Sequence, residues 1–344
     1  MSFIDEKIKK EIEDGVIPGM NYGIVSDRSI IGSVGYKQLV PNKEITSIDT
    51  LYDIASLTKV VVTVPLICKM IVNKKISFDD KVKKYLPRFK YDDVIIYNLL
   101  THTSGLPADL DDKKIVSKQN ILDNVYSKDK IYETSKGVVY SDLGYILLGE
   151  IIEQVYDKPL DIVANEEIFL PLEMHNTCYN PLNAEKCAAT EVVEGRGIVK
   201  GIVHDEKACS MNGVAGHAGV FSNVHDLMNF VKMILNDGLY NDKQFLPKEF
   251  IDLWFEPLVY DKKSEWERSF SWIVGNNDIV IEEGKNIISF NGFTGPSISI
   301  DRDKRIGIVL MTNRIHPTRN NRKLSSERPL ISKEIYDKLY TKHL

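Results

Sequence analysis

The sequence has few cysteines, no excess of basic residues and no long hydrophobic run. Its four cysteines lie far apart and form no Cys-x-x-Cys pair. This spacing argues against a zinc ribbon or a disulfide framework, and buried reduced thiols are the simplest interpretation. Lysine and arginine number 44 against 49 acidic residues, so a net charge of −5 gives no basic surface for nucleic acid or an anionic membrane.

Targeting signals are also missing. The longest strongly apolar run, 60–68, has nine residues and is too short to cross a bilayer. The N-terminus is charged within its first five residues and lacks the apolar core and small-residue cleavage site of a signal peptide. We therefore expect a cytoplasmic protein without a membrane partner, unless an export signal preceded the sequence as given.

What is present is an ordinary globular composition, with 43% apolar and 27% charged residues in a chain of 344. This length is typical of about two domains, or of one unit with two lobes. Apolar spacing and β-branched runs predict a helix at 3–14, strands at 21–26, 29–36, 287–290, 297–301 and 305–312, and a helix at 331–340. The middle of the chain has a mostly helical pattern, for example at 143–155 and 226–235. One sheet built from both termini, with an inserted helical lobe, fits this order.

Three stretches contain no charged residue: 94–108, 208–225 and 286–300. They are polar and contain glycine, which is typical of cleft walls, where the backbone must approach a ligand closely. Polar loops near turns are the alternative interpretation.

Ser56 and Lys59 form a Ser-x-x-Lys motif at the start of a predicted helix at 60–70. Residues three apart share a helix face, so the hydroxyl and the amine can meet. A serine nucleophile needs a neighbouring base, and a partly desolvated lysine at a helix N-terminus can serve through a lowered pKa. Alone the motif is weak, because serine often caps helices.

Two further motifs accompany it. Tyr140-Ser141-Asp142 precedes the predicted helix at 143–155, and the segment 100–106 reads Leu-Thr-His-Thr-Ser-Gly-Leu. Together the three motifs resemble those of the serine hydrolases of the penicillin-binding-protein and class C β-lactamase superfamily, over nearly the whole chain. The resemblance implies that Ser56 forms an acyl-enzyme, that Lys59 activates it and that Tyr140 transfers protons. A phenol acts as a base only beside cations, and Lys59 is the expected one.

Asp142 departs from the superfamily pattern, in which the second motif usually ends in asparagine. A carboxylate here would raise the pKa of Lys59 and make the lysine a poorer free base, although it would still orient the amine. The alternative is that Asp142 only caps the following helix.

The third motif of the superfamily is a lysine or histidine, then threonine and glycine, on a strand that lines the cleft. Its best match here is Phe290-Asn291-Gly292, which lacks the basic residue and resembles an esterase branch with Trp-Gly-Gly. The resemblance implies that Gly292 lets the acyl group approach the strand, and that the N–H groups of Ser56 and Phe293 form the oxyanion hole. Without a cation at Phe290, we expect poor binding of penicillins and of peptides with a free D-Ala carboxylate. The alternative is that a nearby arginine such as Arg314 reaches into the cleft and replaces the missing charge.

Three more segments look like a subgroup that contains muramoyl-L-alanine amidases and low-activity penicillin-binding proteins: 201–206, 213–222 and 310–317. His204 and His217 lie in these segments, and we expect both in the cleft. Imidazole suits zinc, but the spacings of thirteen and eight residues between His204, His217 and His225 match no ligand loop, so neither a metal nor a cofactor is expected. Hydrogen bonding within the cleft and purely structural roles are the alternatives.

These observations predict one catalytic unit, 1–344, of the α/β (α+β) class with the penicillin-binding-protein-like transpeptidase fold. An antiparallel sheet flanked by terminal helices forms an α/β lobe from 1–72 and 243–344, and the helical lobe is 73–242. The expected reaction is hydrolysis of an amide bond in a peptidoglycan-derived or related peptide through an acyl-enzyme. A carboxylic ester is the second substrate class, and a catalytically weak protein that binds peptidoglycan fragments is the alternative outside catalysis.

The expected partner is therefore a small molecule or muropeptide, and the oligomeric state stays open. The predicted catalytic residues are Ser56, Lys59, Tyr140 and Phe293. The predicted substrate-binding residues are Asp142, His204, His217, Phe290, Asn291 and Gly292.

Overall fold

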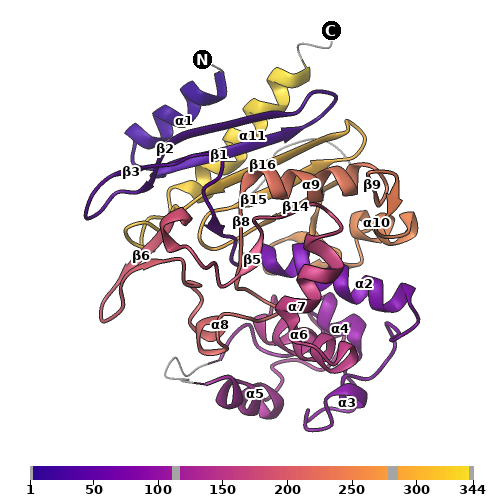
Figure 1. Ribbon diagram of the computed structural model, residues 1–344. Helices are drawn as coiled ribbons and strands as arrows, with labels where there is room; N and C mark the ends of the chain where they lie inside the picture. The colour runs from indigo at the N-terminus through magenta and orange to yellow at the C-terminus, as the bar shows by residue number, and fades with distance from the viewer. Residues whose placement is uncertain (1–2, 111–116, 278–285, 341–344) are drawn as a thin grey trace.

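The computed structural model describes residues 3–110, 117–277 and 286–340. Its main element is a nine-stranded antiparallel sheet with the order β11-β12-β13-β14-β15-β16-β1-β2-β3 (Figure 1). The strands are β1 (Gly19–Val25), β2 (Ile30–Gln38), β3 (Glu44–Ile45), β11 (Val259–Asp261), β12 (Trp266–Arg268), β13 (Ile273–Val274), β14 (Ile287–Asn291), β15 (Ser297–Asp301) and β16 (Ile306–Thr312). The two ends of the chain meet where β1 pairs with β16, with Tyr22 opposite Leu310.

Smaller elements fill the region between these strands in the sequence. Short strands form three further sheets: β4 (Tyr52–Asp53), β8 (Val220–Ser222) and β5 (Cys178–Tyr179); β6 (Ala189–Val193) and β7 (Gly197–Lys200); β9 (Leu239–Tyr240) and β10 (Lys243–Gln244). The α-helices are α1 (Phe3–Glu13), α2 (Val64–Val72), α3 (Val82–Tyr85), α4 (Ile96–Leu100), α5 (Lys118–Ser127), α6 (Asp142–Tyr156), α7 (Leu160–Ala164), α8 (Glu206–Ser210), α9 (Val224–Leu235), α10 (Lys248–Phe255) and α11 (Leu324–Tyr340). Two π-helical segments, η1 (Lys59–Thr63) and η2 (Asn165–Phe169), and a 3₁₀ segment, η3 (Ala184–Lys186), complete the set.

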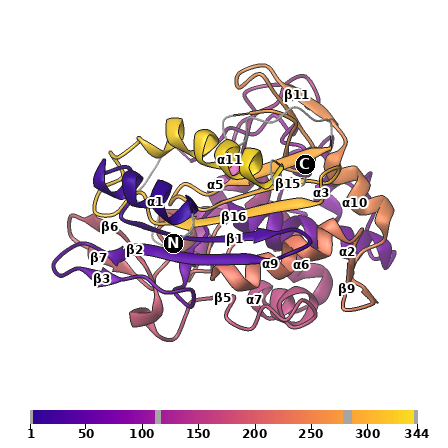
Figure 2. The same ribbon diagram turned by 90° about the horizontal axis from the view of Figure 1, so that it is seen from above.

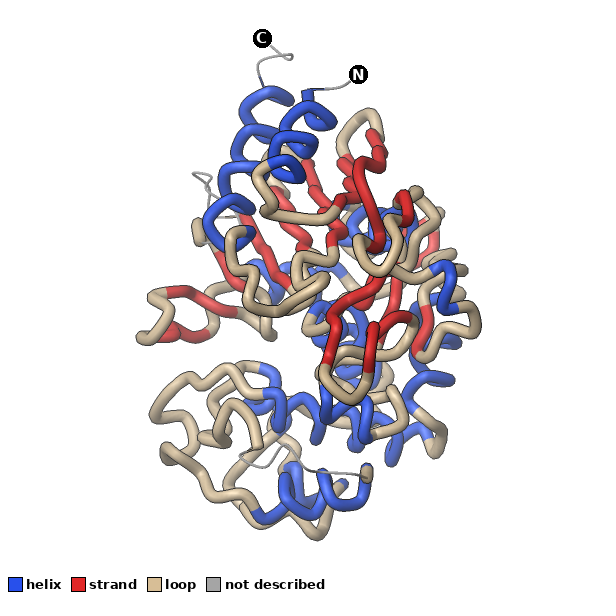
Figure 3. The backbone as a smooth tube through the Cα atoms, turned by 90° about the vertical axis from the view of Figure 1, so that its left-hand side faces the viewer, coloured by secondary structure: helices blue, strands red, loops and turns tan. Residues whose placement is uncertain are grey.

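Helices cover both faces of the large sheet (Figures 2 and 3). α1 and α11 lie on one face, where Ile8 and Ile335 belong to one buried core. α9 lies on the other face, and a Cβ at Gly23 of β1 would be only 2.4 Å from the sulfur of Met228. Glycine at this position therefore lets α9 approach the sheet closely.

Most elements expected from the sequence are confirmed, with two differences. α11 begins at Leu324, before the predicted start at residue 331. The sequence did not predict this first part of the helix because residues 325–329 carry no apolar periodicity, although Leu324 is buried. The helix predicted at 60–70 begins as a π-helical turn, in which the N–H of Val64 donates to the carbonyl of Lys59. Pro65 follows directly and has no N–H for the carbonyl four residues earlier, which favours such an irregular turn.

The buried faces of α2 and α6 belong to an apolar core that also contains residues of the large sheet, such as Ile288 of β14 and Val309 of β16. In the described part of the chain, no helix is both long and apolar enough to cross a membrane. The start of η1, the end of α4 and the start of α6 carry the three motifs.

Candidate active site

A tight turn presents Ser56 to a cavity of about 330 Å³. Between β4 and η1, Ala55 has a φ of 47°, in the left-handed region that strains a residue with a side chain. The carboxylate of Asp53 holds this turn, because it accepts the N–H of Ala55 at 2.8 Å and the N–H of His204 at 2.7 Å. The local strain is thus balanced by two buried hydrogen bonds.

Lys59 is fully buried beneath Ser56. Its Nζ donates to Ser56 Oγ at 3.1 Å and to the carbonyl of His217 at 3.2 Å, and lies 2.8 Å from Asp142 Oδ1. Burial alone would lower the pKa of Lys59, but the charge of Asp142 and the hydrogen bonds to Asp142 and Tyr140 outweigh burial and raise it. In the same way burial opposes ionisation of Asp142, yet Lys59 lowers the pKa of this carboxyl group.

The expectation of a lowered lysine pKa is therefore wrong, and the effect expected of Asp142 is confirmed. The helix N-terminus contributes a partial charge, whereas Asp142 places a full negative charge at contact distance from Lys59. The resting state is an ion pair of a protonated Lys59 with an ionised Asp142.

Tyr140 lies between two cations. The Nζ of Lys59 is 4.9 Å from the centroid of the Tyr140 ring, and the guanidinium carbon of Arg268 is 5.6 Å from it. Arg268 is buried on β12 and forms an ion pair of 3.4 Å with Asp261. Two positive charges beside the ring stabilise negative charge on the phenol oxygen when a proton leaves it.

His102, from the segment 100–106, supports Tyr140. Its ring centroid is 4.8 Å from that of Tyr140, and its Nδ1 accepts the N–H of Ser141 at 3.1 Å. Nε2 therefore carries the proton and donates to Ser271 Oγ at 2.7 Å. Burial holds the pKa of His102 well below its usual value, so this neutral ring is a fixed support for the second motif.

The turn after β14 approaches the Ser56 turn. A Cβ at Gly292 would be 2.3 Å from the carbonyl oxygen of Ile54, so only glycine permits this contact. Among the residues that the structure describes, neither the N–H of Ser56 nor that of Phe293 has a hydrogen-bond acceptor. Two unpaired N–H groups on adjoining turns suit the binding of a developing oxyanion.

The predicted residues are only partly brought together on the cavity wall. Ser56, Tyr140, Asp142, His204 and Phe293 line the cavity, Lys59 and His217 are buried, and Phe290, Asn291 and Gly292 are not among the lining residues. Phe290 is 3% exposed, and its ring lies 6.1 Å from that of Tyr140 and 6.4 Å from that of Trp272. The first side chain of the third motif thus packs behind Tyr140, because its apolar ring is better buried there than exposed in a polar cleft.

A network of ion pairs forms the rest of the wall. The Nζ of Lys207 lies 2.9 Å from a carboxylate oxygen of Asp109, 3.3 Å from one of Asp205 and 3.4 Å from one of Asp142. Burial opposes the charge of Lys207, but these three carboxylates outweigh burial and raise the pKa of the ammonium. Lys207 therefore stays charged and neutralises the acidic side of the cleft.

Arg319 neutralises the neighbouring carboxylates. It pairs with Glu191 at 2.7 Å and with Glu206 at 2.8 Å. A hydrogen bond of 2.9 Å also joins Glu191 to His204 Nε2. The His204 ring stacks on the exposed ring of Phe293, with centroids 5.7 Å apart. His204 thus holds its part of the cavity wall through hydrogen bonds and stacking.

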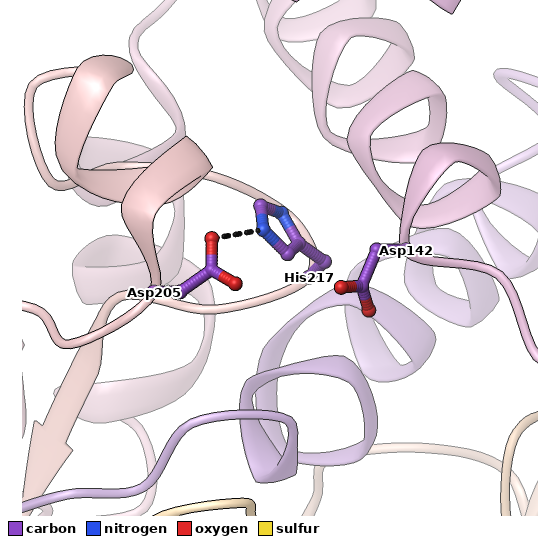
Figure 4. Close-up of side chains that lie close together, drawn as sticks. All are labelled: Asp142, Asp205 and His217. Carbon is purple, nitrogen blue, oxygen red and sulfur yellow. Dashed lines mark hydrogen bonds and ion pairs between the residues drawn. The ribbon is translucent and has the colours of Figure 1, made fainter. Parts of the chain in front are cut away.

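Asp142, Asp205 and His217 gather closely enough that one ligand atom from each lies within 4.8 Å of the others (Figure 4). Such a set suits a metal ion, which the sequence did not indicate. Here, however, Asp205 Oδ1 is 2.8 Å from His217 Nε2, and both carboxylates are paired with Lys59 or Lys207. A divalent ion would have to displace two ammonium groups, so the donor set fits an ion-pair network better than a metal centre.

Sequence reasoning missed Lys207, Asp109, Arg319 and Arg268. A signal for the first two existed, because Lys207 directly precedes the uncharged stretch 208–225 and Asp109 directly follows 94–108. Charges at the edges of such stretches lie where a cleft wall meets solvent. Arg319 and Arg268 carry no comparable signal.

Comparison with known proteins agrees with this geometry. The family model Beta-lactamase matches residues 4–329. An N-acetylmuramyl-L-alanine amidase of Bacillus subtilis (strain 168) is 31% identical, over 91% of this chain and 80% of that protein. A putative D-alanyl-D-alanine carboxypeptidase of Escherichia coli (strain K12) is 31% identical, over 91% of this chain and 82% of that protein. A solved class C β-lactamase matches with a TM-score of 0.76 at 19% identity, over 96% of this chain and 95% of that chain, which confirms the expected fold. The chain belongs to the β-lactamase family and is a serine hydrolase with the fold of class C β-lactamases and penicillin-binding proteins.

Proposed function

We propose that this enzyme hydrolyses an amide bond in a peptide derived from peptidoglycan, with Ser56 as the nucleophile. The observation that carries the proposal is the hydrogen bond of 3.1 Å between Ser56 Oγ and the ammonium group of Lys59. Ser56 lines the cavity, and Lys59 is buried behind it. The named activities of the amidase and of the putative carboxypeptidase support the substrate class, since both chains align over most of their length.

In the first step Ser56 Oγ attacks the amide carbon, and its proton passes to the Tyr140 oxygen while the Tyr140 hydroxyl gives its own proton to the amide nitrogen. The oxygen of the tetrahedral intermediate accepts hydrogen bonds from the N–H groups of Ser56 and Phe293. The bond between the carbonyl carbon and this nitrogen then breaks, the amine leaves, and the acyl-enzyme remains. Water attacks the ester in the second step, gives its proton to Tyr140, and the Ser56 oxygen leaves and is reprotonated.

Lys59 acts in this scheme as a charged group rather than as a free base. Its raised pKa keeps the ammonium form, which orients Ser56 Oγ and, with Arg268, stabilises the negative charge that develops on the Tyr140 oxygen during proton transfer. Asp142 acts through Lys59 and is a positioning residue.

The charges of the cleft favour an amide substrate without a carboxylate beside the leaving group. Lys207 and Arg319 are the cations on the wall in the described part of the chain, and each already pairs with two or more carboxylates. A substrate carboxylate would have to compete with these partners. Penicillins and peptides ending in D-Ala are therefore poorer candidates than an internal amide, and a neutral carboxylic ester is the second candidate.

A fluorophosphonate probe tests the nucleophile. Intact-mass measurement should find one adduct on the wild type and on Ser210→Ala, a control whose hydroxyl bonds the backbone of α8. Ser56→Ala should take up no probe and lose turnover by a factor on the order of 10⁴ or more. Absence of an adduct on the folded wild type would favour a protein that only binds peptidoglycan fragments.

A second measurement tests the bond. Purified muropeptides, D-amino-acid amides and short acyl esters are incubated with the enzyme, and the products are separated by mass. We expect a new amine and a new carboxyl terminus from a muropeptide. Hydrolysis of esters with intact muropeptides and amides would replace the amidase assignment by an esterase.

A further inference from the structure

A second cavity, of about 660 Å³, lies next to the segment that carries Tyr140. One wall is the loop between α5 and α6, at 132–138, and the other is the edge strand β11 with the turn that follows it, at 259–263. It shares no lining residue with the catalytic cavity. We call it the tyrosine–lysine groove, after the side chains described next.

Two exposed aromatic rings line this groove. Tyr132 is 52% exposed and Tyr260 is 54% exposed, and the only other exposed aromatic side chain in the described part of the chain is Phe293, at 46%, in the catalytic cavity. Each exposed aromatic ring of the described residues therefore lies in one of two neighbouring hollows. Exposed rings in a hollow present flat apolar faces, which suit the stacking of sugar rings.

Three lysines line the same groove: Lys136, Lys262 and Lys263. Within the described residues none of the three side chains forms an ion pair, although the protein carries a net charge of −5. An anionic ligand meets free ammonium groups here, whereas in the catalytic cleft it would have to displace carboxylates. The groove therefore selects a ligand with both ring faces and negative charge.

The loop that carries Tyr132 is held in place before any ligand arrives. The N–H of Ile131 donates to the carbonyl of Gly105 at 2.8 Å, and Asp93 binds both Lys130 and Thr134 at 2.7 Å. A Cβ at Gly105 would be 2.1 Å from the carbonyl oxygen of Tyr132, so the loop packs directly on backbone. A loop whose backbone is already held loses little conformational freedom on binding.

The groove comes close to the catalytic cavity at the segment that precedes Tyr140. Val138 lines the groove and Tyr140, two residues later, lines the cavity, so their Cα atoms are at most about 7 Å apart. A single extended molecule can therefore occupy both.

We propose that the tyrosine–lysine groove binds an anionic saccharide, with its rings on Tyr132 and Tyr260 and its carboxylates on the three lysines. The proposal rests on the proposed function, because it places peptide-free muramic acid residues of a peptidoglycan fragment, whose carboxylates are free, in the groove and the peptide amide of a neighbouring residue at Ser56. The reaction at Ser56 does not require the groove. Experiments can therefore refute the amidase function and saccharide binding in the groove independently of each other.

Binding is measured by calorimetry on the wild type with two peptide-free probes. The acidic probe is a tetrasaccharide of alternating N-acetylglucosamine and N-acetylmuramic acid, and the neutral probe is a tetrasaccharide of N-acetylglucosamine alone. We expect the acidic probe to bind more tightly, with an affinity that falls as salt is added. Equal affinities without salt dependence, or no binding of either probe, would overturn the proposal.

Variants locate the site. Tyr132→Ala and Tyr260→Ala should each weaken the acidic probe by about two- to tenfold. Lys262→Gln with Lys263→Gln should remove most of the salt dependence, and the charge-matched control Lys186→Gln with Lys243→Gln, exposed elsewhere, should leave it unchanged. Unaltered binding in the groove variants would overturn the proposal.

Hydrolysis of p-nitrophenyl butyrate by the same groove variants checks that the catalytic centre is intact, and we expect wild-type rates. Saccharide binding with intact ester hydrolysis but without muropeptide cleavage would refute the proposed amidase function and support the groove. Muropeptide cleavage that is unchanged in all groove variants would support the proposed amidase function and refute the role of the groove.

Discussion

The catalytic cleft and the tyrosine–lysine groove are both lined by residues of one segment, 137–140, and both combine aromatic rings with lysines. Their charges are arranged in opposite ways. In the cleft, Lys59 lies 2.8 Å from Asp142 and Lys207 lies 2.9 Å from Asp109. In the groove, Lys262 and Lys263 have no carboxylate partner among the described residues.

The difference separates two uses of a lysine. A buried, paired lysine has its protonation state fixed by its neighbours and supplies a charge to the reaction. An exposed, unpaired lysine is screened by salt and supplies affinity to a ligand. Changes in the cleft should therefore alter rates and pH profiles, whereas changes in the groove should alter affinity and its dependence on salt.

The largest expected effect beyond loss of Ser56 is that of Tyr140→Phe. The ring keeps its contacts with His102 and Phe290, and only the hydroxyl that transfers protons is lost. Single-turnover acylation by an activated ester should fall about 10²- to 10⁴-fold while binding of the ester is little changed. Tyr240→Phe, which removes a partly buried hydroxyl near Glu173, is the control and should keep the wild-type rate. Weaker binding with an unchanged acylation rate would make Tyr140 a binding residue and remove the contrast with the groove.

The fold could be predicted where the signal is local. The hairpin of β1 and β2, the strands β14 to β16 and helices α1, α6 and α9 each carry enough apolar periodicity to be identified from their own residues. β11, β12 and β13 have only two or three residues each and owe their existence to pairing with neighbours, so no periodicity marks them. This edge of the sheet carries Arg268 and one wall of the groove, and both were therefore missed.

The site could be predicted where motif residues are neighbours in sequence. Ser56 and Lys59 meet because they are three residues apart at a helix start. The protonation state of Lys59 depends instead on its distance from Asp142, 83 positions later in the chain, and on complete burial. Phe290 shows the same limit, because its motif position suggested a cleft residue and its packing against Trp272 buries it.

Asp142→Asn is expected to have a smaller effect on rate but a distinct effect on pH dependence. Without this carboxylate, the effect of burial on Lys59 is less opposed, and burial lowers the pKa of the ammonium group. If the charged form is required, the alkaline limb of the kcat/KM profile moves to lower pH. A profile whose acidic limb moves down instead, with a gain in activity near neutrality, would show that Lys59 acts as a free base.

The same variant should lose stability in a defined pH range. The pKa of Lys59 is raised in the folded protein. Its contribution to the free energy of unfolding is therefore fully present below the usual pKa of lysine and is lost as pH rises through the raised pKa. The pKa of Asp142 is lowered in the folded protein. Its contribution to the free energy of unfolding is therefore fully present above the usual pKa of aspartate and is lost as pH falls through the lowered pKa. Urea unfolding of Asp142→Asn should therefore show a loss of about 3 kcal/mol between the usual values of 3.8 and 10.5, and a smaller loss in stronger acid. A loss that does not change with pH would indicate altered packing rather than a broken ion pair.

The smallest expected effect is that of Phe290→Lys on acylation by benzylpenicillin. The sequence alone predicts an improvement, because a cation at the third motif gives a substrate carboxylate a hydrogen bond of about 1.5–3 kcal/mol. In the structure Phe290 is buried behind Tyr140, and Arg268 already places a cation beside that ring. A lysine there adds charge to a region that is fully paired, so the acylation rate should change by less than about tenfold, the factor that 1.5 kcal/mol gives. Phe290→Leu, which keeps the apolar packing, is the control for lost aromatic contact, and stopped-flow mass or absorbance measurement of the acyl-enzyme gives both rates. A gain well above tenfold would show that position 290 faces the substrate and that the cleft, like the groove, has room for an unpaired cation.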